Sequence, residues 1–196
     1  MQRRLGGSFS GYYVFPGGTV DANDFTDLPC TLSPTTAAAA EFDSVAAIKA
    51  HCVAVIRETF EEAGFLLARD QHGRDLSLDK NFTQHELAAL RAGQLSFSDY
   101  IRQNQITLNG QYLDYFARWV TPPISPKRWD TRFFVTTVRH APRIDYCPDE
   151  MQGFQWLRPQ AALSDRRIKL VSPTRNTLQQ ISQAASAADA HELLTR

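Results

Sequence analysis

The chain has 196 residues, enough for one domain with a sizeable core, and its apolar fraction of 43% is ordinary for a globular protein. Lysine plus arginine and aspartate plus glutamate each number 21, so the formal net charge is zero. That balance excludes a chain-wide basic field that would attract nucleic acid or an anionic membrane. Three cysteines without metal-ligand spacing exclude a disulfide scaffold and predict a reducing, cytoplasmic setting, and no apolar run is long enough to predict a membrane span.

Residues 11–14 form the first predicted strand, which ends in a turn at Pro16, Gly17 and Gly18. The two glycines allow the backbone to approach a metal ion or a phosphate closely. Residues 21–43 contain prolines and a Thr-Thr-Ala run, so we predict a loop with a helical turn. The acidic residues of this loop are predicted to form a solvated face: Asp21, Asp24 and Asp27.

A long helix is predicted to begin after Ser44, which can cap its N-terminus, and to end at Gly64, where a left-handed residue is favoured. The last turns carry Glu58, Glu61 and Glu62 at i, i+3 and i+4, so three carboxylates share one side of this helix. Apolar residues recur at spacings of three and four and define its buried face: Ile48, Cys52, Val55, Ile56 and Phe60.

Three crowded carboxylates repel one another, and at least one has a raised pKa unless a cation relieves the repulsion. Mg²⁺ or Mn²⁺ takes oxygen ligands and keeps waters that substrate phosphates displace, so the cluster predicts a divalent-metal site. Arg57 lies four residues before Glu61 and is predicted to pair with it. Considered alone, the cluster is more typical of a solvated acidic helix end.

Residues 66–112 are predicted to carry two short helices. A capping box of Thr83 and Glu86 opens the first helix, and Ser98 caps the second. The segment is compatible with a lid over a substrate, with plain packing, or with the interface of a homodimer.

Two strands are predicted next, at 112–120 and 132–138, because these stretches are rich in aromatic and β-branched residues. Arg128 and Arg132 are candidate substrate-binding residues, since arginine matches a phosphate bidentately. Surface or structural pairing of the two side chains is an equal alternative. The remaining predicted elements are a strand at 154–157, helices at 159–163 and 174–182, and a helical tail from residue 184.

Two stretches resemble the halves of the box that marks Nudix hydrolases: Val14-Phe15-Pro16-Gly17-Gly18 and Arg57-Glu58-Thr59-Phe60-Glu61-Glu62-Ala63-Gly64-Phe65. Asp24 stands six residues after Gly18, where the family has a glutamate. Gly18 and Arg57 are 39 residues apart (57 − 18 = 39), against about 14 in the family, so about 25 residues are inserted. Nudix proteins related to the peroxisomal coenzyme A diphosphatases of animals carry such an insert. Three further stretches resemble that branch: 119–122, 129–134 and 153–157.

The resemblance runs from about residue 11 to residue 178 and implies a single Nudix domain over 1–196. The implied fold is α/β, an α/β/α sandwich around a mixed sheet, with helical insertions at about 21–43 and 66–112. The family normally has an apolar strand before residue 11, and this chain begins too late for it. We therefore expect that strand to be missing and the stability to be lower than that of a longer relative.

For the site, the resemblance implies a metal-dependent hydrolase that cleaves the diphosphate of a nucleoside diphosphate linked to another moiety, with Mg²⁺ or Mn²⁺ as cofactor. Glu61 and Glu62 are the first-choice metal ligands. Glu58 binds metal or takes the proton from the attacking water, and Arg57 orients Glu61. Two further residues receive roles from the same resemblance: Gly18, whose carbonyl coordinates metal, and Glu150, which binds metal or acts as the base.

Coenzyme A or acyl-coenzyme A is the substrate that the insert-bearing branch implies. The motif associated with coenzyme A hydrolases has its glycine at Gly11 but an arginine where Gly7 stands, so ADP-ribose, NADH or another dinucleotide stays open. A catalytically silent nucleotide sensor is the non-enzymatic alternative, and the complete set of charged box residues argues against it. Neither a basic face nor a zinc pattern supports nucleic-acid binding.

Overall fold

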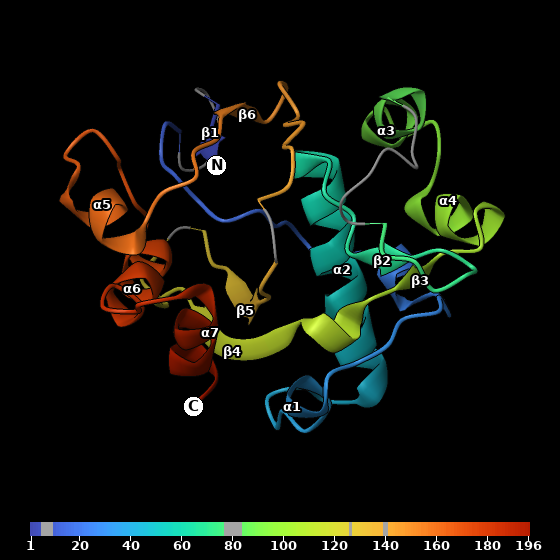
Figure 1. The fold of residues 1–196 in the computed structure, drawn as a ribbon, viewed down its shortest axis with the longest axis horizontal. Helices are drawn as coiled ribbons and strands as arrows, with labels where there is room; N and C mark the ends of the chain where they lie inside the picture. Colours follow the sequence, from blue (N-terminus) through green and yellow to red (C-terminus); the bar gives the residue numbers. More distant parts are fainter. Residues whose placement is uncertain (5–9, 77–83, 126, 139–140) are drawn as a thin grey trace.

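A computed structural model describes the chain except for residues 5–9, 77–83, 126 and 139–140 (Figure 1). Its helices are η1 (Ala22–Phe25), α1 (Pro34–Ala37), α2 (Val45–Ala63), α3 (Gln84–Arg91), α4 (Phe97–Gln103), η2 (Gly110–Tyr112), α5 (Pro159–Ser164), α6 (Ser172–Gln180) and α7 (Ala187–Thr195). Its strands are β1 (Gln2–Arg3), β2 (Ala68–Arg69), β3 (Thr107–Leu108), β4 (Asp114–Val120), β5 (Asp130–Val135) and β6 (Met151–Gly153).

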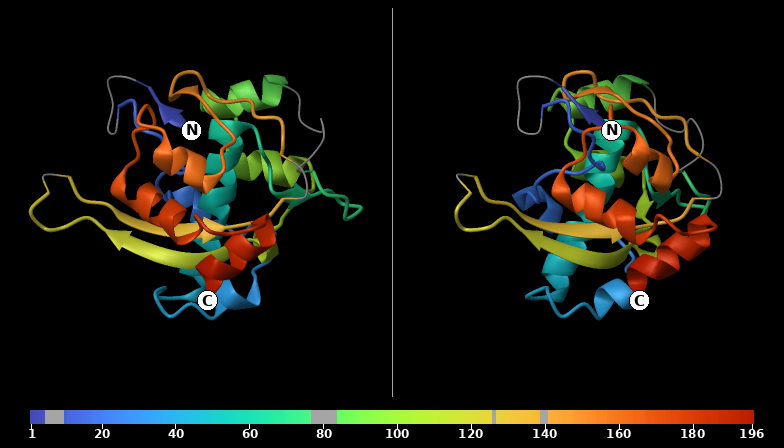
Figure 2. Two further views of the ribbon diagram at one scale, coloured as in Figure 1. Left: turned by 60° about the vertical axis from the view of Figure 1, so that its left-hand side comes forward. Right: turned by 90° about the vertical axis from the view of Figure 1, so that its left-hand side faces the viewer.

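The middle layer of the molecule is the antiparallel pair β4 and β5, which are the two strands predicted for this part of the chain. α2 covers one face, where Tyr115 and Phe134 join its apolar side chains in one buried cluster. α6 and α7 cover the other face (Figures 1 and 2), and His191 of α7 pairs with Asp114 at 2.8 Å. Isolated parallel bridges add to the antiparallel ladders, so the pairing is mixed. The predicted α/β/α sandwich is confirmed.

The predicted long helix is α2, and its two ends lie where the sequence places them. The hydroxyl of Ser44 accepts a hydrogen bond from the Ala47 N–H at 3.1 Å, and Gly64 ends the helix with a φ of 68°. Cys52, Ile56 and Phe60 are at most 1% exposed, which confirms the predicted apolar face. No helix in the described part of the chain is long and apolar enough to cross a bilayer.

Both insertions pack against this framework. The first contributes Thr36, whose hydroxyl donates to the Leu113 carbonyl at 2.8 Å and fixes α1 at the start of β4. The second contributes α3 and α4, and the ring of Tyr100 stacks on Phe60 of α2 at 5.7 Å. The cap of α4 is Ser96 rather than the predicted Ser98, because the helix begins two residues earlier, at Phe97. Thr83, predicted to open α3, lies outside the described residues.

The structure corrects the predicted strands near both chain ends. Residues 11–14 supply only single bridges at Tyr13, to Gln2 and to Leu170. Residues 1–4 contribute the two-residue strand β1, so the longer apolar strand of the family has no counterpart among the described residues. β6 ends at Gly153, which pairs with Gln2 of β1, and residues 154–157 are exposed and irregular, so the strand predicted there is wrong.

Gly110 marks the contact between the two insertions and provides a test of their packing. A Cβ at this position would collide with the Thr31 carbonyl oxygen and lie 3.1 Å from Cys30 Sγ. We expect Gly110→Ala to lower the free energy of unfolding by about 1–3 kcal/mol, measured by urea denaturation. Gly153→Ala is the matched control, since a Cβ there meets nothing within 4 Å. Equal stabilities of the two variants would contradict this packing.

Candidate functional site

Three carboxylates gather on the last two turns of α2, beside the glycine turn at residues 17–18. The Gly17 N–H donates to Glu62 Oε2 at 2.9 Å. Gly18 lies so close to the Glu58 carboxylate that a Cβ on this residue would overlap it. Glu61 lies one turn after Glu58, with its side chain 26% exposed. The loop and the helix, far apart in sequence, therefore form one acidic site, as the sequence predicts.

Arg57 is the buried cation at the centre of this site. Its Nη1 donates to Glu58 Oε1 at 2.7 Å and to Glu61 Oε2 at 3.3 Å. Its Nη2 donates to the Thr19 carbonyl at 2.9 Å, which ties the glycine loop to the helix. The predicted pairing of Arg57 with Glu61 is present, and the contact with Glu58 is the shorter of the two.

Asp24 corrects the sequence prediction of a solvated acidic face. Its carboxylate accepts two hydrogen bonds from Arg57, at 3.0 Å from Nε and 3.0 Å from Nη2, and the residue is 2% exposed. η1 holds the carboxylate in place because Asp24 Oδ2 also accepts from the Asp21 N–H at 2.8 Å. Asp27, by contrast, has a side chain that is 98% exposed and pairs only loosely with Lys49. Asp24 thus occupies the position that the Nudix box gives to a glutamate.

Burial disfavours the ionised form of all three glutamates and raises their pKa values. Burial raises the pKa of Glu61 to about 7, with Arg57 acting in the opposite sense and Glu58 adding repulsion. Burial raises the pKa of Glu62 to about 8, although the Gly17 N–H favours its anion. The pKa of Glu58 is also raised by burial. Burial opposes the charge of Arg57, but Asp24 and Glu58 outweigh it and raise its pKa.

Glu150 lies beside this cluster, and Arg3 of β1 connects the two. Arg3 Nη1 is 3.6 Å from Glu62 Oε1, and Arg3 Nη2 is 4.0 Å from Glu150 Oε2. The backbone of Arg4 also donates to the Glu150 carbonyl at 2.8 Å. Arg3 is a site residue that the sequence does not indicate, because nothing in its local spacing shows that β1 pairs next to the acidic helix end.

The two arginines predicted to bind phosphate lie elsewhere. Arg128 is exposed on the β4–β5 hairpin and donates to the Thr121 carbonyl at 3.3 Å. Arg132 pairs with Asp130 at 3.4 Å, and its guanidinium lies 5.3 Å from the centre of the Phe42 ring. In the described part of the chain, the contacts of both side chains are with the hairpin and with residues 41–42, not with the carboxylates of α2.

The three glutamates of α2 are the side chains that could hold a divalent cation at this site. Among the described residues, no three aspartate, glutamate, histidine or cysteine side chains already converge on one point for a metal. Arg57 shares the oxygens of Glu58 and Glu61, and Arg3 lies against Glu62. The set still fits a hard cation, since it consists of adjacent carboxylates that are wholly or partly shielded from water and whose pKa values are raised.

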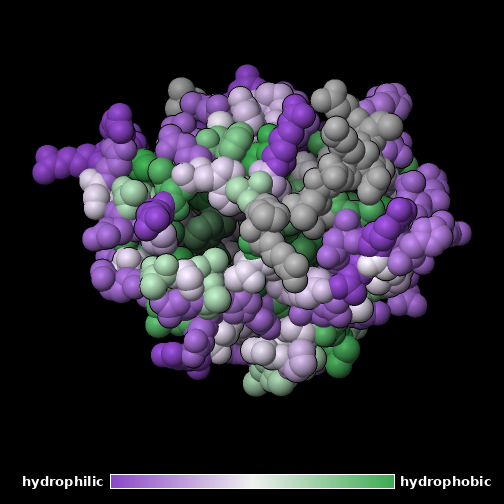
Figure 3. Space-filling view, in the orientation of Figure 1, coloured by the Kyte–Doolittle hydropathy of each residue, from purple (hydrophilic) through white to green (hydrophobic). Residues whose placement is uncertain are grey.

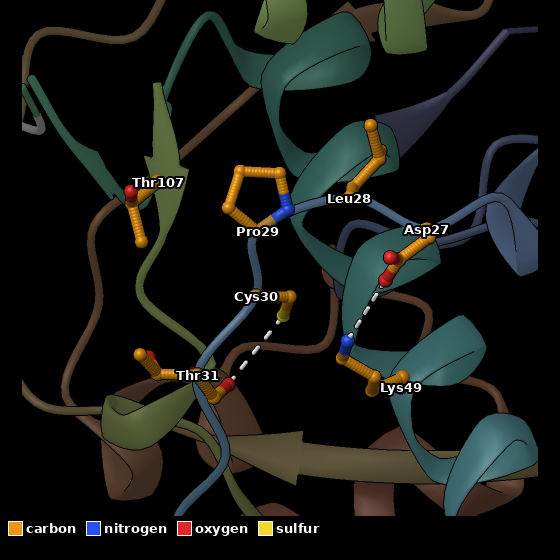
Figure 4. Close-up of a pocket in the computed structure, with 7 residues that line it drawn as sticks. All are labelled: Asp27, Leu28, Pro29, Cys30, Thr31, Lys49 and Thr107. Atoms are coloured by element: carbon orange, nitrogen blue, oxygen red, sulfur yellow. Dashed lines mark hydrogen bonds and ion pairs between the residues drawn. The ribbon is translucent and has the colours of Figure 1, made fainter. Parts of the chain in front are cut away.

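Figure 3 shows a hollow in the surface on the α5 side of α2. A separate cavity of about 440 Å³ lies at the first insertion (Figure 4). Lys49 of α2 lines this cavity. It precedes Glu58 by nine residues (58 − 49 = 9), or about 13 Å along the helix. The cavity is therefore distinct from the acidic site. Its lining consists of Asp27, Leu28, Pro29, Cys30, Thr31, Lys49 and Thr107.

Comparison with known proteins supports the geometry. The family model described as the NUDT19 Nudix domain matches residues 43–174. The crystal structure of a Nudix hydrolase from Alicyclobacillus acidocaldarius superposes with a TM-score of 0.78 at 27% identity, over 97% of this chain and 85% of that one.

Among curated proteins, the acyl-coenzyme A diphosphatase NUDT19 of Xenopus laevis is 24% identical over 221 aligned positions, covering 93% of this chain and 58% of that protein. Human NUDT19, with the same description, is 26% identical over 163 positions, covering 71% and 41%. A Nudix protein of Caenorhabditis elegans is 26% identical over 152 positions, covering 78% and 43%. The chain thus spans about half the length of these relatives. On the family match and the shared fold, the chain belongs to the Nudix hydrolase family.

Proposed function

We propose that this chain hydrolyses the diphosphate bond of a nucleoside diphosphate derivative at the acidic end of α2. The observation that carries the proposal is the contact between the glutamates and the glycine turn. Glu62 accepts a hydrogen bond from the Gly17 N–H. The Glu58 carboxylate occupies the space that a side chain at position 18 would fill. Grouping three mutually repelling carboxylates, one buried and two partly buried, beside a glycine turn is typical of a functional site.

Nudix hydrolases generally use divalent metal ions, and we propose Mg²⁺ or Mn²⁺ here. Glu58, Glu61 and Glu62 would hold the ion, with the carbonyl of Gly18 as a further oxygen ligand. When bound, a divalent cation neutralises charge on the diphosphate and lowers the pKa of water. Arg57 orients Glu58 and Glu61, since its guanidinium contacts both carboxylates.

Two residues are candidates for the base that takes the proton from the attacking water. Glu58 is the first, because its carboxylate is only partly buried and lies against the glycine turn. Glu150 is the second, because its side chain is 52% exposed and lies next to Arg3 beside Glu62. Glu58→Gln and Glu150→Gln, each measured for kcat and for Mn²⁺ binding, would separate the roles: loss of the base lowers kcat and leaves Mn²⁺ binding nearly unchanged, whereas loss of a metal ligand weakens Mn²⁺ binding as well.

For the substrate, we propose coenzyme A or acyl-coenzyme A first. The support is the match to the NUDT19 Nudix domain and the description of two relatives as acyl-coenzyme A diphosphatases. Arg128 and Arg132 stay candidates for a substrate phosphate on the sequence alone, since their contacts are with the hairpin and with residues 41–42. ADP-ribose and NADH are the alternative substrates, and nucleotide binding without turnover is the non-enzymatic alternative.

A substrate panel tests this proposal. Coenzyme A, acyl-coenzyme A, ADP-ribose and NADH are each incubated with the protein and Mg²⁺ or Mn²⁺, and the products are identified by mass. We expect coenzyme A or its acyl form to give the highest kcat/KM, with an adenosine bisphosphate and a phosphopantetheine product. Tight binding of any of these compounds without products would favour the sensor instead.

Glu61→Gln should lower metal-dependent turnover by more than about 100-fold, because an amide carries no charge to hold a divalent cation. Circular dichroism and the unfolding midpoint should change little, since Glu61 is partly exposed. The matched control is Glu192→Gln on α7, where the side chain pairs with Arg196 at the surface. Turnover near that of the unmodified protein in Glu61→Gln would remove this residue from the proposed ligands.

Asp24→Asn should lower both stability and turnover, because the amide removes the most deeply buried anionic partner of the Arg57 guanidinium. We expect a loss of about 1–3 kcal/mol in the free energy of unfolding and about 10-fold or more in kcat. Asp27→Asn provides the control, since the Asp27 side chain is 98% exposed. If both variants behaved alike, the buried pair would have no bearing on the site.

A further inference from the structure

We propose that Arg91, the last residue of α3, is a positioning residue that holds the acidic end of α2 at a fixed distance from the segment carrying Glu150. The inference gives residues 66–112 a role in the site. Its consequence for turnover rests on the proposed function, whereas its structural consequence does not.

Arg91 makes three hydrogen bonds to two segments that are distant in sequence. Its Nε donates to the Glu61 carbonyl oxygen at 2.7 Å. Its Nη1 donates to Asp145 Oδ1 at 3.3 Å, and its Nη2 donates to the Asp145 carbonyl oxygen. The side chain is 17% exposed, so these contacts are shielded from water. One guanidinium thus joins a proposed metal ligand to residue 145.

The same contacts complete the C-terminus of α2. The last carbonyls of a helix lack partners within the helix and need others. Arg91 takes the Glu61 carbonyl, the Cys147 N–H donates to the Glu62 carbonyl at 3.0 Å, and the Asp145 N–H donates to the Ala63 carbonyl at 2.9 Å. The positive charge of Arg91 is also favourable at this negative end of the helix dipole.

These bonds continue directly to Glu150. A turn links Cys147 to Glu150, whose N–H donates to the Cys147 carbonyl at 3.3 Å. The distance from Glu150 to the glutamates of α2 is therefore set by residues 145–147 lying along the helix end. Gly64 permits this close approach, because a Cβ there would lie 2.9 Å from the Asp145 Cβ.

α3 is firmly placed, so its last residue can fix the position of others. Leu87 and Leu90 are 1% and 5% exposed in the same buried cluster as Phe60. This packing favours a fixed support over a moving lid. Lysine could not replace Arg91, since one ammonium lacks the planar fork that reaches the Glu61 carbonyl, Asp145 Oδ1 and the Asp145 carbonyl together.

Amide hydrogen exchange tests the inference without requiring turnover. In Arg91→Ala and Arg91→Lys we expect the amides of Asp145 and Cys147 to exchange at least about 10-fold faster than in the unmodified protein. Arg102→Ala, at an exposed arginine in the last turn of α4, is the matched control and should leave both amides protected. The lysine variant keeps the charge and the stem and decides the question if the alanine variant does not fold.

The second readout is the Mn²⁺ ion alone, titrated into each variant and followed by the signal of free Mn²⁺. We expect binding to weaken about 10-fold in both Arg91 variants, and kcat on the best substrate to fall about 10–100-fold with KM changed less than about 3-fold. Unchanged exchange at Asp145 and Cys147 would overturn the inference. If the unmodified protein hydrolyses nothing, the proposed function fails, while the exchange result still decides the role of Arg91.

Discussion

The structure depends on the burial of one guanidinium between four oxygen-bearing partners. The Arg57 side chain is 10% exposed and donates to Asp24, Thr19, Glu58 and Glu61. A buried charge is tolerated only when its hydrogen-bonding groups are satisfied, and here the planar fork of arginine meets this condition. Because the partners come from η1, the glycine loop and α2, satisfying one cation also fixes three chain segments relative to one another.

Much of the fold could be predicted from the sequence, because the signals were local. Ser44, the apolar residues up to Phe60, and Gly64 define α2 within one continuous stretch, so periodicity and capping were sufficient. The strands β4 and β5 were detected from their aromatic and β-branched residues, with errors confined to their ends. The grouping of the three glutamates followed from helix geometry, which needs no tertiary information.

The remaining site residues could not be predicted, because their roles depend on contacts between distant parts of the chain. Asp24 stands six residues after Gly18, where the Nudix box has a glutamate, but this spacing does not show that Asp24 is buried against Arg57 while Asp27 is exposed. Burial of a single carboxylate is a tertiary property that composition does not encode. Arg3 likewise acquires its position only through the pairing of β1 with β6. Residues 154–157 were predicted as a strand from their local sequence, whereas the ladder with β1 ends at Gly153.

The Asp24–Arg57 pair joins residues that are 33 positions apart, whereas the usual Nudix box separates them by about 8. A fourfold longer loop adds only about 1.2 kcal/mol of closure entropy, and the hydrogen bonds of Thr36 at the start of β4 help to offset it. The length of this segment is therefore weakly constrained by energy. A search for related proteins that fixes the spacing of the box would overlook such chains, whereas one that looks in space for a carboxylate hydrogen-bonded to the arginine before the glutamates would find them.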